Sequence, residues 1–212
     1  MRRTAQGFTL IEIMVVIAII AGLVTTVAIM VPKMQETQKQ TGCMGNLQQL
    51  GGLFLTHKLE NPAKSMRYSG VSLWLSYRKG SSDIAKGEEK ALACGGDPGT
   101  LLPQNEDDKK KWDNVDLDNP ADGLCSYAGR DFKNAPLDAE RTEREVIGCD
   151  RQGPDGKTMH HKDVIVCAFD SGAADRMNRE ELGVGSEEKI IIGPEAQNPM
   201  LRKVVYIVRK TD

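Results

Sequence analysis

The chain has 212 residues, which suffice for one membrane-spanning segment and one globular domain of ordinary size but not for a second full domain. Its formal net charge is −2, and its 28 Lys and Arg residues are interspersed with 30 Asp and Glu residues instead of forming a basic stripe. With few aromatic residues as well, the composition excludes nucleic acid as an expected partner.

An apolar block runs from Phe8 to Val31 and contains a single ionisable residue, Glu12. As a helix with a rise of about 1.5 Å per residue, its 24 residues would reach about 36 Å, more than the roughly 30 Å of a bilayer's hydrocarbon core. Arg2 and Arg3 precede the block, and such charges favour the cytoplasmic side. We therefore predict a single-pass protein of the inner membrane, with its globular part in the periplasm or at the cell exterior.

Three kinds of N-terminal segment compete as explanations of this block: a cleaved secretory signal, a plain membrane anchor, and a prepilin leader joined to a stem helix. A secretory signal has an apolar region of about 7 to 15 residues followed by a small-residue cleavage site, whereas this block is longer and has no clear site at its end. A plain anchor gives no role to Glu12, although a charge in hydrocarbon costs about 3 kcal/mol or more. The sequence favours the third explanation.

Residues 7–12, which read GFTLIE, resemble the cleavage and methylation motif of type IV prepilins and pseudopilins. The resemblance implies that a membrane aspartyl peptidase, the prepilin peptidase, cuts after Gly7 and that the new amine of Phe8 is methylated. Glycine suits this position because it has no side chain to obstruct an extended backbone in a protease groove. The resemblance also implies that Glu12 pairs with the amine of a neighbouring subunit, which gives Glu12 a role in assembly.

Beyond the apolar block, Pro32 can kink a helix, and apolar residues recur at helical spacing up to about Glu60. This amphipathic stretch is expected to pack on a head domain and to end at Asn61-Pro62. The chain then reads as irregular, with loops at 95–99 and 105–123. Short strands are predicted at Leu124–Ala128, Val164–Phe169, Lys189–Ile192 and Lys203–Val208.

The expected fold is α+β and pilin-like, with a long N-terminal helix packed against a small antiparallel β-sheet head with long loops. The first half of the helix is expected to span the membrane. The domain order is a leader at 1–7, a transmembrane half of the stem at 8–31, an amphipathic half at 32–61 and an extracytoplasmic head at 62–212.

The head also resembles pilin-like proteins whose heads carry a histidine, nine further residues and then an Asp-Gly pair. Here nine residues separate His160 from Asp170, and Ser171 takes the place of the glycine. Further matches in the family's order are Cys43 with residues 46–51, Trp74-Leu75, Cys94 with Asp97-Pro98, and Ser126-Tyr127.

All five cysteines follow the apolar block and therefore share the compartment to which it delivers them. An oxidising compartment favours disulfides, and an odd number leaves at least one thiol unpaired. The sequence does not choose a connectivity. The candidates for disulfides are the head cysteines, Cys94, Cys125, Cys149 and Cys167.

Two groups of residues are candidates for a metal site. His160 and Asp170 combine imidazole and carboxylate, which suit zinc, but the polar start of a strand and a turn explain them more simply. Asp116 and Asp118 lie in an acidic stretch that suggests calcium, which some major pseudopilins bind, yet the spacing lacks the glycine and the distal glutamate of an EF-hand. We expect no metal and no cofactor, with calcium as the alternative.

The sequence has no G-x-S-x-G, HExxH or phosphate-loop motif, and we therefore expect no enzyme. It predicts a structural subunit, a pseudopilin or minor pilin, of a type IV pilus-like or type II secretion filament. Its partners would be other pilin subunits, the prepilin peptidase and the lipid bilayer. The alternative is a membrane-tethered extracytoplasmic module that binds a ligand or a metal ion.

Overall fold

The structure is a computed structural model of the chain, and its contacts divide the chain into two compact units, Met1–Gln38 and Lys39–Asp212. We call the second the head unit. The residues that the structure describes are 9–79, 83–85, 88–95, 97, 102–103, 105–121, 123–138, 144–151, 161, 163–186 and 188–206.

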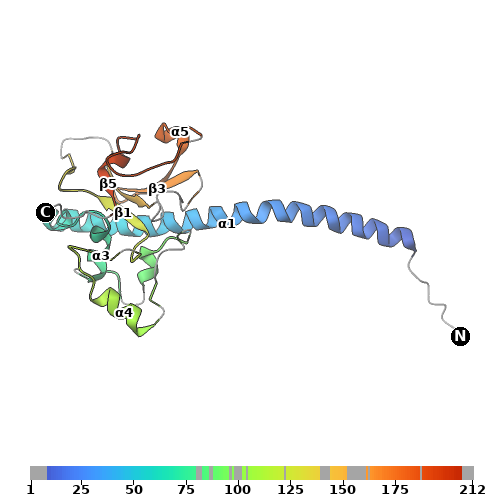
Figure 1. Cartoon of the computed structure of the whole chain (residues 1–212), viewed down its shortest axis with the longest axis horizontal. Coiled ribbons are helices and arrows are strands. Elements are labelled where there is room, and N and C mark those ends of the chain that lie inside the picture. The colour runs from blue at the N-terminus through green and yellow to red at the C-terminus, as the bar shows by residue number, and fades with distance from the viewer. Residues whose placement is uncertain are drawn as a thin grey trace. The chain divides into compact units, whose positions relative to one another are not determined.

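The longest element is helix α1, Leu10–Glu60, which supplies the described part of the first unit and the beginning of the head unit (Figure 1). The helix continues without a break through Pro32. Its expected end is confirmed, because Asn61 accepts a hydrogen bond from the N–H of Lys64 at 3.1 Å and so caps the next helix, α2 (Pro62–Ser65). Pro62 stands at the start of α2, where a missing N–H costs nothing.

Within the head unit, α1 packs through one face. Cys43, Leu47, Leu50 and Phe54 are fully buried, and their spacing of three or four residues places them on the same side of the helix. Gly51 belongs to this face, since a Cβ on it would lie 3.2 Å from the carbonyl oxygen of Gly172. The helix therefore approaches the turn after strand β3 closely.

The head unit holds a five-stranded antiparallel sheet with the order β4-β3-β2-β1-β5. This confirms the expected α+β arrangement of a long N-terminal helix on a small antiparallel sheet. The strands are β1 (Tyr127–Arg130), β2 (Val146–Asp150), β3 (Val164–Phe169), β4 (Ala174–Asn178) and β5 (Val204–Val205).

The two faces of the sheet carry separate apolar clusters. Along β3 the side chains alternate, so that Val166 and Ala168 join one cluster while Ile165, Cys167 and Phe169 join the other. The first cluster contains the buried face of α1 and most of α3 (Val71–Lys79). The second contains residues of α5 (Arg179–Leu182) and of the short helix η2 (Leu201–Lys203).

The strand predictions were partly right. Val164–Phe169 is confirmed as β3, and the predicted strands at 124–128 and 203–208 overlap β1 and β5. The prediction at Lys189–Ile192 is wrong, because these residues do not pair in the sheet, and the three isoleucines among them pack in or against the second cluster. Strands β2 and β4 were not predicted: β2 contains Gly148, and β4 is mostly exposed and carries no β-branched residue.

Two stretches that the sequence analysis took as irregular are helical, α3 and α4 (Glu106–Asp113). Helix α4 begins after Asn105, whose side chain accepts a hydrogen bond from the N–H of Asp108 at 2.8 Å, and lysine–carboxylate pairs run along it. Only Trp112 of this helix is buried. The composition of α4 therefore resembles that of a loop. The loop prediction for 105–123 is nevertheless wrong over Glu106–Asp113. The remaining short helix is η1, Glu89–Leu92.

Candidate functional site

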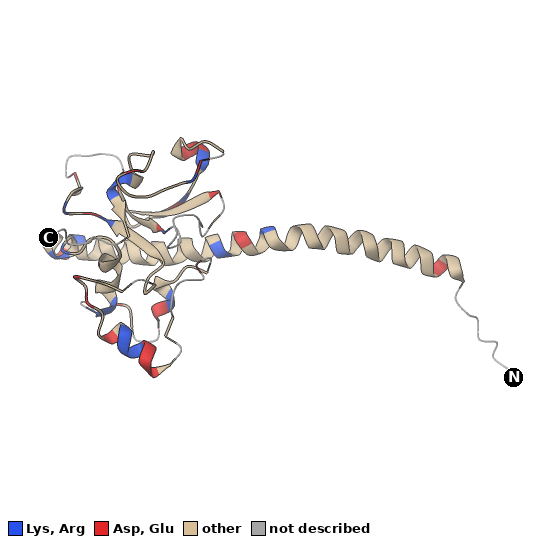
Figure 2. Ribbon diagram, viewed as in Figure 1, with Lys and Arg blue, Asp and Glu red and all other residues tan. Residues whose placement is uncertain are grey.

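The N-terminal half of α1 has an apolar surface. Every residue from 9 to 35 is exposed, and the large apolar side chains from Leu10 to Met34 have exposed fractions between 41 and 78%. In Figure 2 no part of the α1 ribbon is coloured as a charged residue between the one near its start and those at its middle, and residues 13–32 contain no charged residue. This stretch is long and apolar enough to cross a membrane. The surface fits membrane anchoring, because such a patch is unfavourable in water.

Glu12, the one carboxylate among residues 9–35, caps the helix. The backbone N–H and the hydroxyl of Thr9 each donate to Oε2 of Glu12 at 2.8 Å, and the N–H of Glu12 donates to the hydroxyl of Thr9 at 3.3 Å. This reciprocal arrangement is a capping box, with the negative charge at the positive end of the helix dipole. The expected cleavage residues Gly7 and Phe8 lie outside the described residues.

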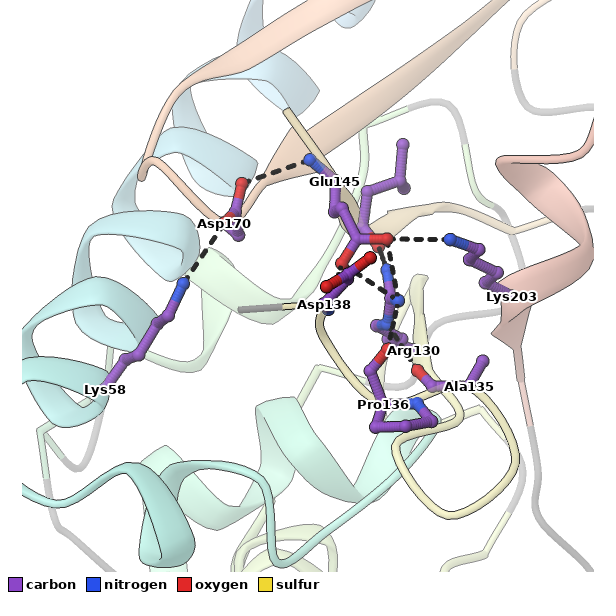
Figure 3. A network of polar contacts seen from close by, with 9 residues as sticks. Lys58, Arg130, Ala135, Pro136, Asp138, Glu145, Asp170 and Lys203 are labelled. Carbon is purple, nitrogen blue, oxygen red and sulfur yellow. Dashed lines mark hydrogen bonds and ion pairs between the residues drawn. The ribbon is translucent and has the colours of Figure 1, made fainter. Parts of the chain in front are cut away.

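A buried network of charges ties the head unit together around Arg130 at the end of β1 (Figure 3). Its side chain is fully buried and donates hydrogen bonds to the carbonyl oxygens of Ala135, Pro136 and Val146 at 2.6, 2.7 and 3.1 Å. It also reaches both carboxylate oxygens of Glu145, at 3.1 and 3.2 Å. The guanidinium thus holds a loop and strand β2 against β1.

Glu145 is the second centre of this network. Its carboxylate accepts hydrogen bonds from Lys203 at 2.7 Å and from the N–H of Asp138 at 3.1 Å, besides those from Arg130. Burial opposes ionisation, but these donors outweigh it and lower the pKa of Glu145 from 4.5 to about 2. The stability from this carboxylate is therefore complete above about pH 4.5 and is lost as the pH falls through about 2.

Asp170 connects the network to α1. Its Oδ1 accepts the N–H of Glu145 at 3.1 Å, its own N–H donates to the carbonyl oxygen of Glu145 at 2.9 Å, and its Oδ2 pairs with Lys58 at 3.1 Å (Figure 3). Both carboxylate oxygens thus have protein partners. The residue that sequence analysis offered as a metal ligand joins the start of β2, the end of β3 and α1.

The other metal candidates are placed differently. His160 lies outside the described residues, and Asp116 is exposed and accepts the N–H of Asp118 at 3.0 Å, as in a turn. Within the described residues, one set of three possible ligand side chains comes together, Cys43, Cys94 and His161, and two of these are joined in a disulfide.

The disulfide joins Cys43 of α1 to Cys94, which follows η1, across 51 positions of the sequence. Sequence analysis named Cys94 but left out Cys43, and this is a correction. The candidates Cys125, Cys149 and Cys167 are thiols in this structure. The last two belong to the cluster on the other face of the sheet, which explains why neither bridges to Cys94.

A cavity of about 490 Å³ lies between α3, η1 and α4 and is lined partly by charged residues. Arg78 lines it and is itself paired with Glu89 and Asp113, each at 3.0 Å. Among the described lining residues, the charges are thus largely committed to one another and form no catalytic constellation.

Sequence reasoning missed the residues that hold the head unit together. A signal existed for Cys43, because it extends the stripe of Leu47, Leu50 and Phe54 that was expected to face the head. No signal existed for Arg130 and Glu145, since their partnership depends on the pairing of β1 with β2.

Comparison with known families identifies a motif at the N-terminus. Residues 2–28 match the family model described as the prokaryotic N-terminal methylation motif. The chain carries a pilin-type methylation motif. Together with the long apolar helix, the motif is consistent with a type IV pilin-like protein and supports a pilin or pseudopilin precursor. The pilin-type motif also favours a structural subunit over an enzyme. No curated protein and no solved structure matches the chain.

Proposed function

We propose that the chain is a structural subunit, a pseudopilin or minor pilin, of a type IV pilus-like or type II secretion filament. The observation that carries this proposal is the methylation motif at residues 2–28 on a helix that has an exposed apolar first half and a second half packed into a globular unit. Such a helix can leave the bilayer and pack among copies of itself, because either surrounding covers its apolar surface.

The head belongs on the outer side of the membrane in this proposal. Arg2 and Arg3 favour a cytoplasmic N-terminus, and the bridge between Cys43 and Cys94 fits an oxidising compartment. The prepilin peptidase would then cut after Gly7 at the cytoplasmic face and free the amine of Phe8 for methylation.

We expect Gly7→Val to abolish cleavage when the chain is co-expressed with a prepilin peptidase, because a branched side chain obstructs the extended backbone in the protease groove. The measurement is the intact mass of the membrane-extracted chain, which should keep residues 1–7 in the variant and lose them in the wild type. Gly22→Val is the matched control, since a Cβ at Gly22 meets nothing within 4 Å, and it should be cleaved as the wild type is. Complete cleavage of the Gly7 variant would refute the proposed processing.

We expect Glu12→Gln and Glu12→Ala to be cleaved and inserted but to lower filament yield at least tenfold, because both remove the charge that would pair with a neighbouring amine. Glutamine can keep the capping box with Thr9, whereas alanine cannot. Sheared filaments, quantified by immunoblot against total chain, give the yield. If the Gln variant assembles normally and only the Ala variant fails, Glu12 acts as a helix cap and not as an assembly charge.

A further inference from the structure

Two of the three thiols in the head unit face each other across the sheet. Cys149 in β2 and Cys167 in β3 are direct partners in the antiparallel register, and both are fully buried. Directly opposed residues project their side chains to the same face, with Cβ atoms about 4.5 to 5.5 Å apart. Both cysteines accordingly belong to the cluster on the face that carries α5 and η2.

A β-bulge produces this register. Val146 pairs with Phe169, but after one extra residue Gly148 pairs with Ala168 and Cys149 with Cys167. Had the first register continued, Cys149 would lie opposite Val166. The bulge therefore brings the two thiols together.

The backbone at the bulge has little freedom to change. A Cβ on Gly148 would collide with the ring of Trp74 and would lie 2.6 Å from the carbonyl oxygen of Ala128. Trp74 is itself fixed, since its indole N–H donates to that same oxygen at 2.9 Å. The packing of α3 on the sheet thus holds β2 in the register that opposes the cysteines.

The two thiols are close enough to influence each other. The interaction with the thiol of Cys167, together with burial, raises the pKa of the Cys149 thiol well above its ordinary value. A disulfide places its Cβ atoms about 3.5 to 4.5 Å apart, so that closing this pair requires only a small approach of two side chains.

The remaining thiol has other partners. The sulfur of Cys125 accepts the N–H of Tyr127 at 3.4 Å and lies 3.6 Å from the carbonyl oxygen of the same residue. Burial raises the pKa of Cys125 to about 12, and the residue belongs to the cluster on the other face of the sheet. Of the five cysteines, Cys125 is therefore the one that would stay outside any disulfide.

We propose that Cys149 and Cys167 form a second disulfide in the head unit, made while the head folds and before the sheet buries the pair. The inference rests on the proposed extracytoplasmic location, which supplies a disulfide-containing oxidant, a protein or a small molecule. The thiolate of one cysteine attacks that disulfide, forming a mixed disulfide and releasing one thiolate. The second cysteine attacks the mixed disulfide, closes the Cys149–Cys167 bond and releases the other thiolate. The pair loses two protons and two electrons, and the oxidant becomes two thiols.

The test uses the full-length chain, reduced and unfolded, then refolded in detergent with reduced and oxidised glutathione. The product is denatured without reductant and alkylated, and its mass gives the number of free thiols. Of five cysteines, two bridges use four, so the wild type should take up one alkyl group, on Cys125. A non-reducing peptide map should show the peptides of Cys149 and Cys167 linked.

Two variants show which cysteines carry the counted alkyl groups. Cys167→Ser should take up two alkyl groups, on Cys125 and Cys149, whereas the double variant Cys43→Ser with Cys94→Ser should still take up one. Three alkyl groups on the refolded wild type with the Cys43–Cys94 bridge intact, or a bridge from Cys125 to either partner, would overturn the inference. Chain extracted from the exporting cell's membranes tests the location separately: five alkyl groups there, with one after refolding, would refute the extracytoplasmic head while the pairing stands.

Discussion

Replacing Arg130 with Met is expected to lower the free energy of unfolding of the head unit by about 3 to 5 kcal/mol, the usual cost of removing one partner from a buried ion pair. The loss is large because Glu145 stays buried with its charge only partly compensated. Three carbonyl oxygens also lose the donors that hold a loop and strand β2 to β1. Urea unfolding followed by the fluorescence of the buried Trp74 and Trp112 gives the measurement.

Arg202→Met is the matched control for this substitution. Arg202 also donates to carbonyl oxygens, those of Ala196 and Gln197 at 2.7 and 3.3 Å, but its side chain is exposed. Its loss should cost about 1 kcal/mol or less. The loss in the free energy of unfolding for Arg130→Lys should lie between those of the two Met variants, because lysine keeps the positive charge but lacks the planar guanidinium group. Equal unfolding midpoints for Arg130→Met and Arg202→Met would show that the buried network does not stabilise the head unit.

The stem could be predicted from the sequence because local properties decide it. The hydrophobicity of the block Phe8–Val31 indicates a helix that can span a membrane. The spacing of Leu47, Leu50 and Phe54 indicates the face of the helix that packs on the head. The capping box of Thr9 and Glu12 is equally local, being contained in four consecutive residues.

The head could be predicted only in outline because pairing between distant segments decides it. Strand β2 is recognisable once β1 and β3 flank it, and its bulge cannot be read from composition. Asp170 shows how such pairing affects the prediction of a binding site from sequence. Its carboxylate and the imidazole of His160 made these residues candidates for a metal site, whereas the fold gives this carboxylate Lys58 and the backbone of Glu145 as partners.

Removing the bridge between Cys43 and Cys94 is the second large effect that we expect. The double variant Cys43→Ala with Cys94→Ala should lower the free energy of unfolding by about 4 kcal/mol, because the bridge spans 51 positions and restricts the unfolded chain accordingly. With a slope of about 2 kcal/mol per molar urea, the unfolding midpoint should fall by roughly 2 M. Both cysteines are buried, so part of the loss reflects packing and not the cross-link.

Cys125→Ala separates these two contributions, because Cys125 is equally buried and outside this bridge. Its loss should cost about 1 kcal/mol. Reductant should also lower the wild-type midpoint, since it opens the same bridge. A double variant no less stable than Cys125→Ala would mean that the bridge adds nothing to the packing of α1. The Leu47, Leu50 and Phe54 face and the Lys58–Asp170 pair would then hold the helix in the head unit unaided.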